Sequence, residues 1–348
     1  MTNQAYSMPG VPVGSGAEHR IRELPILVIF PHSRCNCRCV MCDIWRIRQT
    51  REITKQDLEL HLASFRELKV KWIVFSGGEP LMHSDLGSLC RMCRAEGMRS
   101  TLLTAGLLLE KHAEMIVESM DDIIVSIDGP PEIHDRIRGV PDAYRRLHRG
   151  IQRLRGLRPQ IPISGRCTIQ KENYRELRNT VRTAHELNLN CLSFLAADTT
   201  SDAFNRLNGW THERRTTVTL DELEADSLDV EIEALIRECG KEIESGFVVE
   251  SPFKLRRIAR HFRAQLGQEQ ATAPRCNAPW VSAVVESDGT VRPCFFHHPI
   301  GNIHERPFAD ILNSPEAVEF RRHLNIPKNP ICRNCVCSLF LETQVPIA

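Results

Sequence analysis

The stretch Arg34-Cys35-Asn36-Cys37-Arg38-Cys39-Val40-Met41-Cys42-Asp43-Ile44-Trp45 decides how this chain is interpreted. Within it, Cys35, Cys39 and Cys42 have the spacing Cys-x3-Cys-x2-Cys. Three thiolates this close together in a loop can hold three corners of a [4Fe-4S] cluster, whereas a cluster held fully by protein takes four cysteines. The spacing therefore predicts a cluster in which one iron is open to a further ligand.

The composition restricts the class of protein. The chain has 348 residues, of which 42% are hydrophobic and 26% charged, enough for one large domain and a small one. Its net charge is +1, which does not indicate a nucleic-acid or membrane partner. The longest apolar runs, such as residues 25–30, are too short to span a bilayer, and residues 1–17 lack the apolar core of a signal peptide. We expect a soluble, cytoplasmic protein.

The fourteen cysteines are unevenly distributed. Four lie between positions 35 and 42, and five lie between positions 276 and 337. Disulfides are disfavoured in a reducing compartment, where clustered cysteines more often bind metal or take part in chemistry. The distribution therefore predicts two cysteine-based sites.

Short apolar runs alternate with amphipathic stretches, which favours parallel strands joined by right-handed helical crossovers. This pattern alone leaves open an incomplete barrel or a doubly wound sheet. Thr54 and Asp57 resemble a helix capping box. The expected strands are Ile26–Phe30, Trp72–Ser76, Arg99–Thr104, Asp122–Ile127, Ile163–Ile169 and Cys191–Leu195. The expected helices are Lys55–Glu67, Asp85–Glu96, Glu110–Ser119, Ala143–Leu157 and Tyr174–Leu187.

Changes in composition predict four segments. Residues 1–23 form a flexible leader, 24–198 the α/β domain, 199–271 a helical bridge, and 272–348 a small cysteine-rich domain. The bridge has helical patterns at Leu220–Glu244 and Lys254–Glu269, and the last segment has short strands at Val281–Glu286 and Thr290–Pro293. A domain as small as the last one needs a staple, which its cysteines could supply.

A second motif, Ser76-Gly77-Gly78-Glu79-Pro80, directly follows the expected second strand. Two glycines let a ligand approach the backbone closely, and a glutamate accepts hydrogen bonds from an ammonium group. Ligand sites of parallel α/β folds gather at the carboxyl ends of strands, where both motifs lie. The alternatives are a simple turn here, and a zinc site in which His32 joins the first three cysteines.

The cysteine loop and Gly77-Gly78-Glu79-Pro80 together resemble the signature of the radical S-adenosylmethionine (SAM) superfamily. The resemblance implies an α/β fold, a partial (β/α)6 barrel, with a small C-terminal cysteine-rich Fe–S domain. It implies that a [4Fe-4S] cluster binds SAM at its open iron and cleaves it to a 5′-deoxyadenosyl radical, which abstracts hydrogen from the substrate. An electron donor such as flavodoxin or ferredoxin is expected.

The resemblance implies roles for the residues that match the signature of the superfamily. It implies that Cys35, Cys39 and Cys42 are the cluster ligands. Ser126-Ile127-Asp128-Gly129, continuing into Glu132–Gly139, resembles a subgroup marker of cofactor- and peptide-modifying members. Strand alternation turns Arg166 inward, although it could simply line the core. The implied SAM contacts are Met41, Gly77, Gly78, Glu79, Thr104, Ser126, Asp128, Arg166 and Leu195.

The C-terminal cysteines resemble the SPASM/Twitch extension of the same superfamily. Cys276, Cys294, Cys332 and Cys335 are the implied ligands of a second, auxiliary [4Fe-4S] cluster. Four cysteines leave no iron open, which favours electron transfer over substrate binding. A four-cysteine zinc staple is the alternative. Cys337 is a candidate hydrogen-atom donor, an alternate ligand or an idle thiol.

The two clusters together predict a net substrate oxidation, such as a dehydrogenation or a cross-link, with epimerisation and rearrangement as alternatives. The substrate is expected to be a small metabolite, or a peptide presented by another protein, because residues 1–24 leave no room for a leader-peptide domain. An Fe–S electron carrier without SAM chemistry and a zinc-binding interaction module are alternatives from other classes. Cys90 and Cys93 are interpreted as helix packing, and His297 and His298 as turn residues or substrate contacts.

Overall fold

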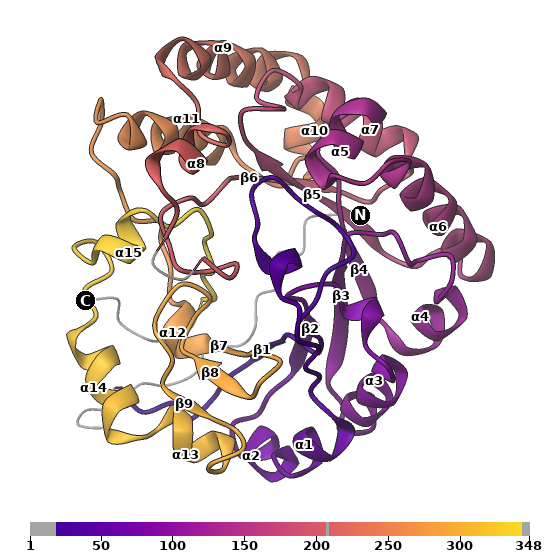
Figure 1. The fold of residues 1–348 in the computed structure, drawn as a ribbon, viewed down its shortest axis with the longest axis vertical. Coiled ribbons are helices and arrows are strands. Elements are labelled where there is room, and N and C mark those ends of the chain that lie inside the picture. Colours follow the sequence, from indigo (N-terminus) through magenta and orange to yellow (C-terminus); the bar gives the residue numbers. More distant parts are fainter. Residues whose placement is uncertain (1–18, 207–208, 343–348) are drawn as a thin grey trace. The chain divides into compact units, whose positions relative to one another are not determined.

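The cysteine loop belongs to the first of two units into which the chain divides (Figure 1). The computed structural model describes residues 19–206 and 209–342. The first unit comprises Cys35–Arg46 and Leu103–Thr272. The second comprises, within the described residues, 19–34, Ile47–Leu102 and 273–342.

Three parallel strands form the sheet of the first unit: β4 (Asp122–Ser126), β5 (Ile163–Ile169) and β6 (Leu192–Ala196). Side chains of β5 alternate strictly between fully buried and half-buried positions, so that Cys167 and Arg166 point to opposite faces. The register aligns Ser126 with Arg166. Strand β5 is therefore buried under helices on one face and lines the site on the other.

Helices cover the outer side of β4 to β6, as Figure 1 shows for α4 to α7. Helix α6 buries Leu147, Ile151 and Leu154, whose spacing of four and three residues places them on one face. Helix α9 starts at a capping box in which Asp221 and Glu224 each accept a backbone N–H. The helices are α4 (Ala113–Ser119), α5 (Pro131–Arg138), α6 (Ala143–Leu157), α7 (Leu177–Glu186), α8 (His212–Thr216), α9 (Glu222–Glu238), α10 (Gly240–Glu244), α11 (Pro252–Gln265) and a 3₁₀ turn at Ile44–Arg46.

The second unit contains a mixed sheet. Strands β1 (Ile26–Ile29) and β2 (Trp72–Phe75), together with most of β3 (Arg99–Thr104), run parallel, and β7 (Ser282–Val285) pairs in parallel with β1 on its other side. Antiparallel β8 (Thr290–Arg292) and β9 (Gly301–Asn302) follow β7. The cysteine-rich C-terminal segment thus adds three strands to the sheet begun by β1 to β3.

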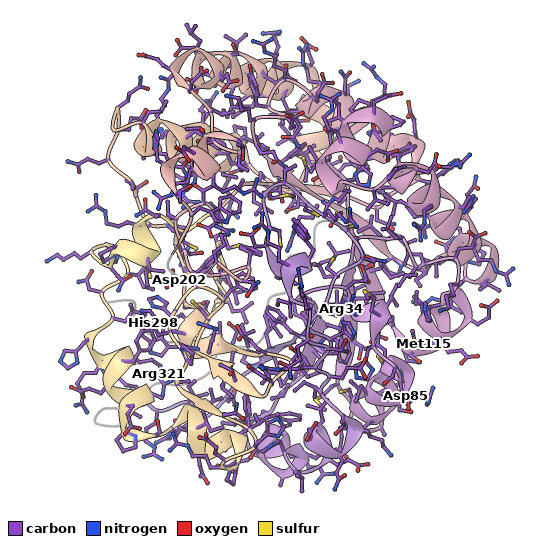
Figure 2. All side chains as sticks on the ribbon, in the orientation of Figure 1. Arg34, Asp85, Met115, Asp202, His298 and Arg321 are labelled. Atoms are coloured by element: carbon purple, nitrogen blue, oxygen red, sulfur yellow. The ribbon has the colours of Figure 1, made fainter. Side chains whose placement is uncertain are left out.

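Helices of the second unit join segments far apart in the sequence. Phe65 and Phe308 pack edge to face with ring centroids 5.4 Å apart, and the buried Arg321, labelled in Figure 2, donates to the carbonyls of His19 and Leu312. The helices are α1 (Lys55–Glu59), α2 (Leu62–Glu67), α3 (Leu86–Ala95), α12 (Ala278–Val281), α13 (Phe308–Leu312), α14 (Pro315–His323), α15 (Pro330–Arg333) and a 3₁₀ turn at Pro80–Met82.

The predicted strands are confirmed to within one residue at each end for all six of the α/β region. The predicted helix 55–67 is wrong in one respect, because it is divided at His61, whose ring nitrogens contact the backbone of Ile303 and Phe308. Its capping box at Thr54 and Asp57 is confirmed. The predicted helix 220–244 is likewise divided, at Cys239, and α5 and α8 were not predicted. In the described part of the chain, no helix combines the length and the apolar character needed to cross a membrane.

Candidate active site and auxiliary cysteine site

The cysteine loop is attached to the end of helix α5 in the first unit. Arg38 N–H donates to the Arg138 carbonyl (2.8 Å), and Val40 N–H donates to the Ile137 carbonyl (3.1 Å). The helix ends at Gly139, which has a φ of 62°, and a Cβ there would lie 2.7 Å from the Arg38 carbonyl oxygen. Only glycine fits both the left-handed conformation and this close approach. The end of the predicted marker Glu132–Gly139 therefore positions the cysteine loop.

Arg138 places a buried positive charge beside one of the three cysteines. Its Nε donates to Asp128 Oδ2 (2.6 Å), and its Nη1 lies within hydrogen-bond distance of Cys39 Sγ (3.5 Å). The Asp128 side chain is completely buried, and its backbone N–H donates to His134 Nδ1 (3.3 Å). Burial opposes ionisation of Asp128, but the charge of Arg138 and hydrogen bonds from His134 and Arg138 outweigh it and lower the pKa of Asp128. Arg138 thus balances the charges of a carboxylate and a thiolate.

The thiols of the loop differ in acidity. A hydrogen bond from the Cys37 thiol and the charge of Arg138 together lower the pKa of Cys39 to about 7. Burial acts in the opposite direction but does not outweigh them. Burial raises the pKa of Cys42 to about 12. Thiolates are the form that binds iron, and a nearby guanidinium favours that form. The donor set of Cys35, Cys39 and Cys42 in one loop, with a cation beside it, fits a [4Fe-4S] cluster held by three cysteines.

Residues 203–206 and 209–214 contact the other side of the loop. Asp43 N–H donates to the Phe204 carbonyl (3.1 Å), and Trp210 Nε1 donates to Asp43 Oδ2. Arg214 Nη2 donates to the Val40 carbonyl (2.7 Å) and its guanidinium stacks on the Trp210 ring. This contact was not predicted. The signal that could have revealed it is a lone tryptophan among arginines in a polar stretch.

Six of the predicted SAM contacts belong to the first unit. Ser126 pairs in register with Arg166, and Leu195 pairs with Thr168 on the next strand. Met41 packs against Ala197, Trp210 and Val218, and its sulfur accepts from Gln170 Nε2 (3.6 Å). Asp128 follows β4 and has one oxygen, Oδ1, without a hydrogen-bond partner. Thr104 is buried at the end of β3, where its hydroxyl accepts from Gly106 N–H (3.0 Å).

The Gly77-Gly78-Glu79 turn is built within the second unit. Gly77 has a φ of 97°, and a Cβ there would lie 2.5 Å from the Phe30 ring. A Cβ on Gly78 would lie 2.2 Å from the carbonyl oxygen of Arg34, which is labelled in Figure 2. Glu79 is fully buried, donates its N–H to that same carbonyl (2.9 Å), and accepts from Leu81 N–H (3.1 Å). Both glycines are therefore required for the turn to pack on the end of β1.

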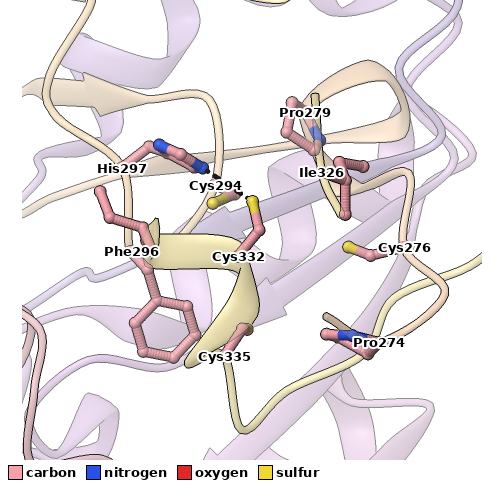
Figure 3. A pocket seen from close by; sticks show the side chains of 10 residues that line it. Pro274, Cys276, Pro279, Cys294, Phe296, His297, Ile326, Cys332 and Cys335 are labelled. Carbon is pink, nitrogen blue, oxygen red and sulfur yellow. Dashed lines mark hydrogen bonds between the residues drawn. The ribbon is translucent and has the colours of Figure 1, made fainter. Parts of the chain in front are cut away.

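The second cysteine site lies wholly in the second unit. Cys276, Cys294, Cys332 and Cys335 line one hollow of about 340 Å³, counting the open space at its mouth. Figure 3 shows the sulfur atoms of Cys276, Cys294 and Cys332 turned toward the same space. The remaining lining residues are Pro274, Pro279, Phe296, His297, Ile326 and Ile331. The structure thus brings together all four cysteines predicted from residues 272–348.

The thiols of this hollow are neutral when no cation is bound. Burial raises the pKa of Cys294 to about 11 and of Cys332 to about 12, and it raises the pKa of Cys335 as well. Iron binds the thiolate form, so iron ions would neutralise the negative charges that the thiols take up on binding. Four thiols around a hollow fit a fully ligated [4Fe-4S] cluster. Cys337 is exposed and is not part of the lining.

His297 was predicted as a turn residue or a substrate contact, and it lies in the bend that directly follows the turn at Phe295 and Phe296. Its side chain is buried and lines the hollow, with Nε2 at 3.4 Å from Cys332 Sγ (Figure 3). His298, next to it, is exposed. Cys90 and Cys93 are fully buried in α3, as predicted.

We predict that Arg138→Met destabilises the protein by about 3–5 kcal/mol, because it leaves Asp128 as an unpaired buried charge. The matched control is Arg136→Met on the same helix, whose exposed ion pair with Glu172 is worth at most about 1 kcal/mol. Urea unfolding of the cluster-free protein measures both changes. Adding Asp128→Asn to Arg138→Met should restore part of the loss. Equal effects of the two arginine substitutions would contradict the proposed charge balance.

We predict that Gly78→Ala lowers the affinity for SAM at least about tenfold, or about 1.4 kcal/mol, because the added methyl displaces the turn from the Arg34 carbonyl. Isothermal titration of anaerobically reconstituted protein measures the affinity. The control is Gly156→Ala in α6, where a Cβ meets nothing within 4 Å. Unchanged affinity in Gly78→Ala protein with a full iron content would show that the turn does not meet SAM.

Comparison with protein families gives two matches. Residues 29–184 match the radical SAM superfamily, and residues 276–336 match the SPASM family, described as an iron-sulfur cluster-binding domain. These ranges contain the two cysteine sites described above.

Several curated proteins are similar over shorter or longer parts of the chain. Fe-coproporphyrin III synthase of Methanosarcina barkeri is 25% identical over 305 residues, covering 82% of this chain and 73% of that protein. AdoMet-dependent heme synthase of the same organism is 32% identical over 161 residues, covering 44% of this chain and 45% of that protein. PqqA peptide cyclase of Bradyrhizobium diazoefficiens is 25% identical over 169 residues, covering 47% of this chain and 44% of that protein. The last two matches thus cover less than half of either protein.

Solved structures share the fold. The structure of anSMEcpe with bound AdoMet superposes with a TM-score of 0.65 at 20% identity, covering 87% of this chain and 84% of that one. Streptococcus suis SuiB bound to its precursor peptide SuiA gives a TM-score of 0.63 at 15% identity, covering 91% of this chain and 72% of that one. The predicted α/β radical SAM fold with a C-terminal Fe–S domain is therefore confirmed. Residues 29–184 therefore form a domain of the radical SAM superfamily, and residues 276–336 form an iron–sulfur cluster-binding domain of the SPASM family.

Proposed function

We propose that this radical SAM enzyme carries out a net oxidation of a small-molecule substrate, with the SPASM cluster as the electron acceptor. The observation that carries the proposal is the convergence of Cys276, Cys294, Cys332 and Cys335 on one hollow. A cluster held by four cysteines has no iron left for substrate, which favours a role in electron transfer. A substrate radical that loses an electron becomes an oxidised product, so a resident acceptor suits dehydrogenation or cross-linking.

The N-terminal site supplies the radical. When bound at Cys35, Cys39 and Cys42, a [4Fe-4S] cluster supplies the electron that cleaves SAM. The residues proposed to hold SAM are Met41, Gly77, Gly78, Glu79, Thr104, Ser126, Asp128, Arg166 and Leu195. Around the cysteines, Arg138 stabilises the Cys39 thiolate, and the contact of Asp43 with Trp210 fixes the end of the loop. These interactions hold the three thiols in place before a cluster is bound.

The proposed substrate is a metal-porphyrin-type macrocycle with carboxylate side chains. One match, to Fe-coproporphyrin III synthase, covers 82% of this chain, and heme synthases match 40–44% of it. In the first unit, Arg206 and Arg214 each have a buried Nε without a hydrogen-bond partner, and both guanidiniums stack on Trp210. Guanidinium groups bind carboxylates, and aromatic side chains stack on flat rings. Both features support a substrate of this chemistry.

A peptide is the second candidate substrate. The similarity of 169 residues of this chain to PqqA peptide cyclase favours it. We further propose that flavodoxin or ferredoxin donates electrons and that the enzyme works in the cytoplasm, where its fourteen cysteines remain reduced. Epimerisation is the alternative reaction, in which the exposed Cys337 would donate a hydrogen atom.

The two cysteine sites should have separable roles. In anaerobically reconstituted protein with dithionite and SAM, Cys35→Ala should abolish formation of 5′-deoxyadenosine, because its cluster loses one of three ligands. Cys276→Ala should keep 5′-deoxyadenosine formation and stop release of oxidised product. Mass spectrometry measures both molecules, and Cys90→Ala, in the core of α3, is the control for a cysteine outside either site. Oxidised product from Cys276→Ala would disprove the role of electron acceptor.

The substrate proposal predicts binding of iron coproporphyrin III to the reconstituted protein, followed as a shift of the porphyrin Soret band. Arg214→Met should weaken this binding at least about tenfold, because the partly exposed Arg214 guanidinium would no longer be there to bind a substrate carboxylate. Arg237→Met, on the exposed face of α9, is the control. If a PqqA-type peptide stimulates 5′-deoxyadenosine formation and the porphyrin neither binds nor reacts, the peptide is the better substrate class.

A further inference from the structure

His297 occupies a position beside the auxiliary site that neither the family matches nor the proposed ligand set explains. The side chain is only 3% exposed, although histidine carries two ring nitrogens that need partners. Its Nε2 lies 3.4 Å from Cys332 Sγ, a normal distance for an N–H···S hydrogen bond (Figure 3). The neighbouring His298 is exposed, so burial of His297 is specific to this position.

The ring of His297 is held in place from two sides. Phe320 of α14 packs edge to face against it, with ring centroids 4.9 Å apart and an interplanar angle of 66°. The His297 carbonyl accepts a hydrogen bond from Arg292 Nη1 (3.0 Å), and Arg292 Nε in turn donates to Glu286 (2.7 Å). The partner sulfur is fixed as well, because Asn329 Oδ1 caps α15 and accepts from the Cys332 N–H (3.1 Å). The Nε2–Sγ contact is therefore set by the fold on both sides.

A histidine in this position is a donor to the ligand sulfur. The four cysteines already complete a [4Fe-4S] cluster, and the imidazole faces one of their sulfurs. Hydrogen bonds to cluster sulfurs draw negative charge from the iron–sulfur core and raise its reduction potential. A higher potential makes a cluster a better electron acceptor, which is the role proposed above.

We propose that His297 Nε2–H donates a hydrogen bond to Cys332 Sγ of the auxiliary cluster and raises the reduction potential of that cluster. His297 is thus a positioning residue for electron transfer, acting through Cys332. This inference rests on the proposed auxiliary cluster and adds the residue that sets its potential.

The test is a redox titration of the full-length protein, followed by electron paramagnetic resonance of the reduced cluster. The parent protein carries Cys35→Ala, Cys39→Ala and Cys42→Ala, so that the signal comes from the auxiliary site alone. His297→Phe keeps a planar ring without a donor. At the midpoint potential of the parent, the His297→Phe variant should have a ratio of reduced to oxidised cluster about tenfold lower. This change corresponds to a midpoint potential lowered by about 59 mV for a one-electron couple.

Two further variants make the result specific. His297→Gln keeps an N–H donor of similar reach and should give a ratio closer to that of the parent than His297→Phe does. His298→Phe, at the exposed neighbour, should leave the ratio unchanged. An unchanged ratio of reduced to oxidised cluster in His297→Phe protein that retains four irons overturns the inference. Loss of the cluster from both His297 variants also overturns it, because the histidine would then be a ligand or a structural residue. If the parent itself binds no iron at this site, the proposed function fails first, so the two failures are distinguishable.

Discussion

The buried charge of Arg138 is the interaction on which the N-terminal site depends. A guanidinium that is removed from water needs negative partners, and here it has two, the Asp128 carboxylate and the Cys39 sulfur. The same residue ends helix α5, and its carbonyl accepts from the loop at Arg38. One side chain and its backbone therefore fix where the cysteine loop runs and stabilise a thiolate within it.

The two cysteine sites solve the same electrostatic problem in different ways. At the N-terminal site, a protein cation and a neighbouring thiol lower the pKa of Cys39 to about 7, so one thiolate is prepared in advance. At the C-terminal site, burial raises the pKa of Cys294 and Cys332, and the four thiols depend on iron for their negative charge. This difference is consistent with the proposed roles, in which the N-terminal cluster keeps one iron open for SAM and the C-terminal cluster is closed by four cysteines.

The sequence was sufficient to predict the strands and the family to which the cysteine loop belongs, because both depend on local patterns. Alternation of buried and half-buried residues in β5 follows from strand geometry, and Cys-x3-Cys-x2-Cys is a contiguous motif. Contacts between distant segments could not be predicted in this way. The hydrogen bond between Asp43 and Trp210 joins residues 167 positions apart, and His297 meets Cys332 across 35 positions. Each of these depends on packing that no local pattern encodes.

Aromatic packing within the second unit connects the turn at Gly77 to the hollow lined by the C-terminal cysteines. The Phe30 ring fills the space where Gly77 would otherwise carry a Cβ, and it packs edge to face on Phe295 with centroids 5.6 Å apart. Phe295 in turn packs on Phe296, which lines the hollow of the auxiliary cysteines. Since rings in contact cannot move independently, the turn at Gly77 and the loop after Cys294 share one rigid support. The pairing of β7 with β1 brings these segments together, which explains why the C-terminal cysteines are built onto the sheet that begins with β1.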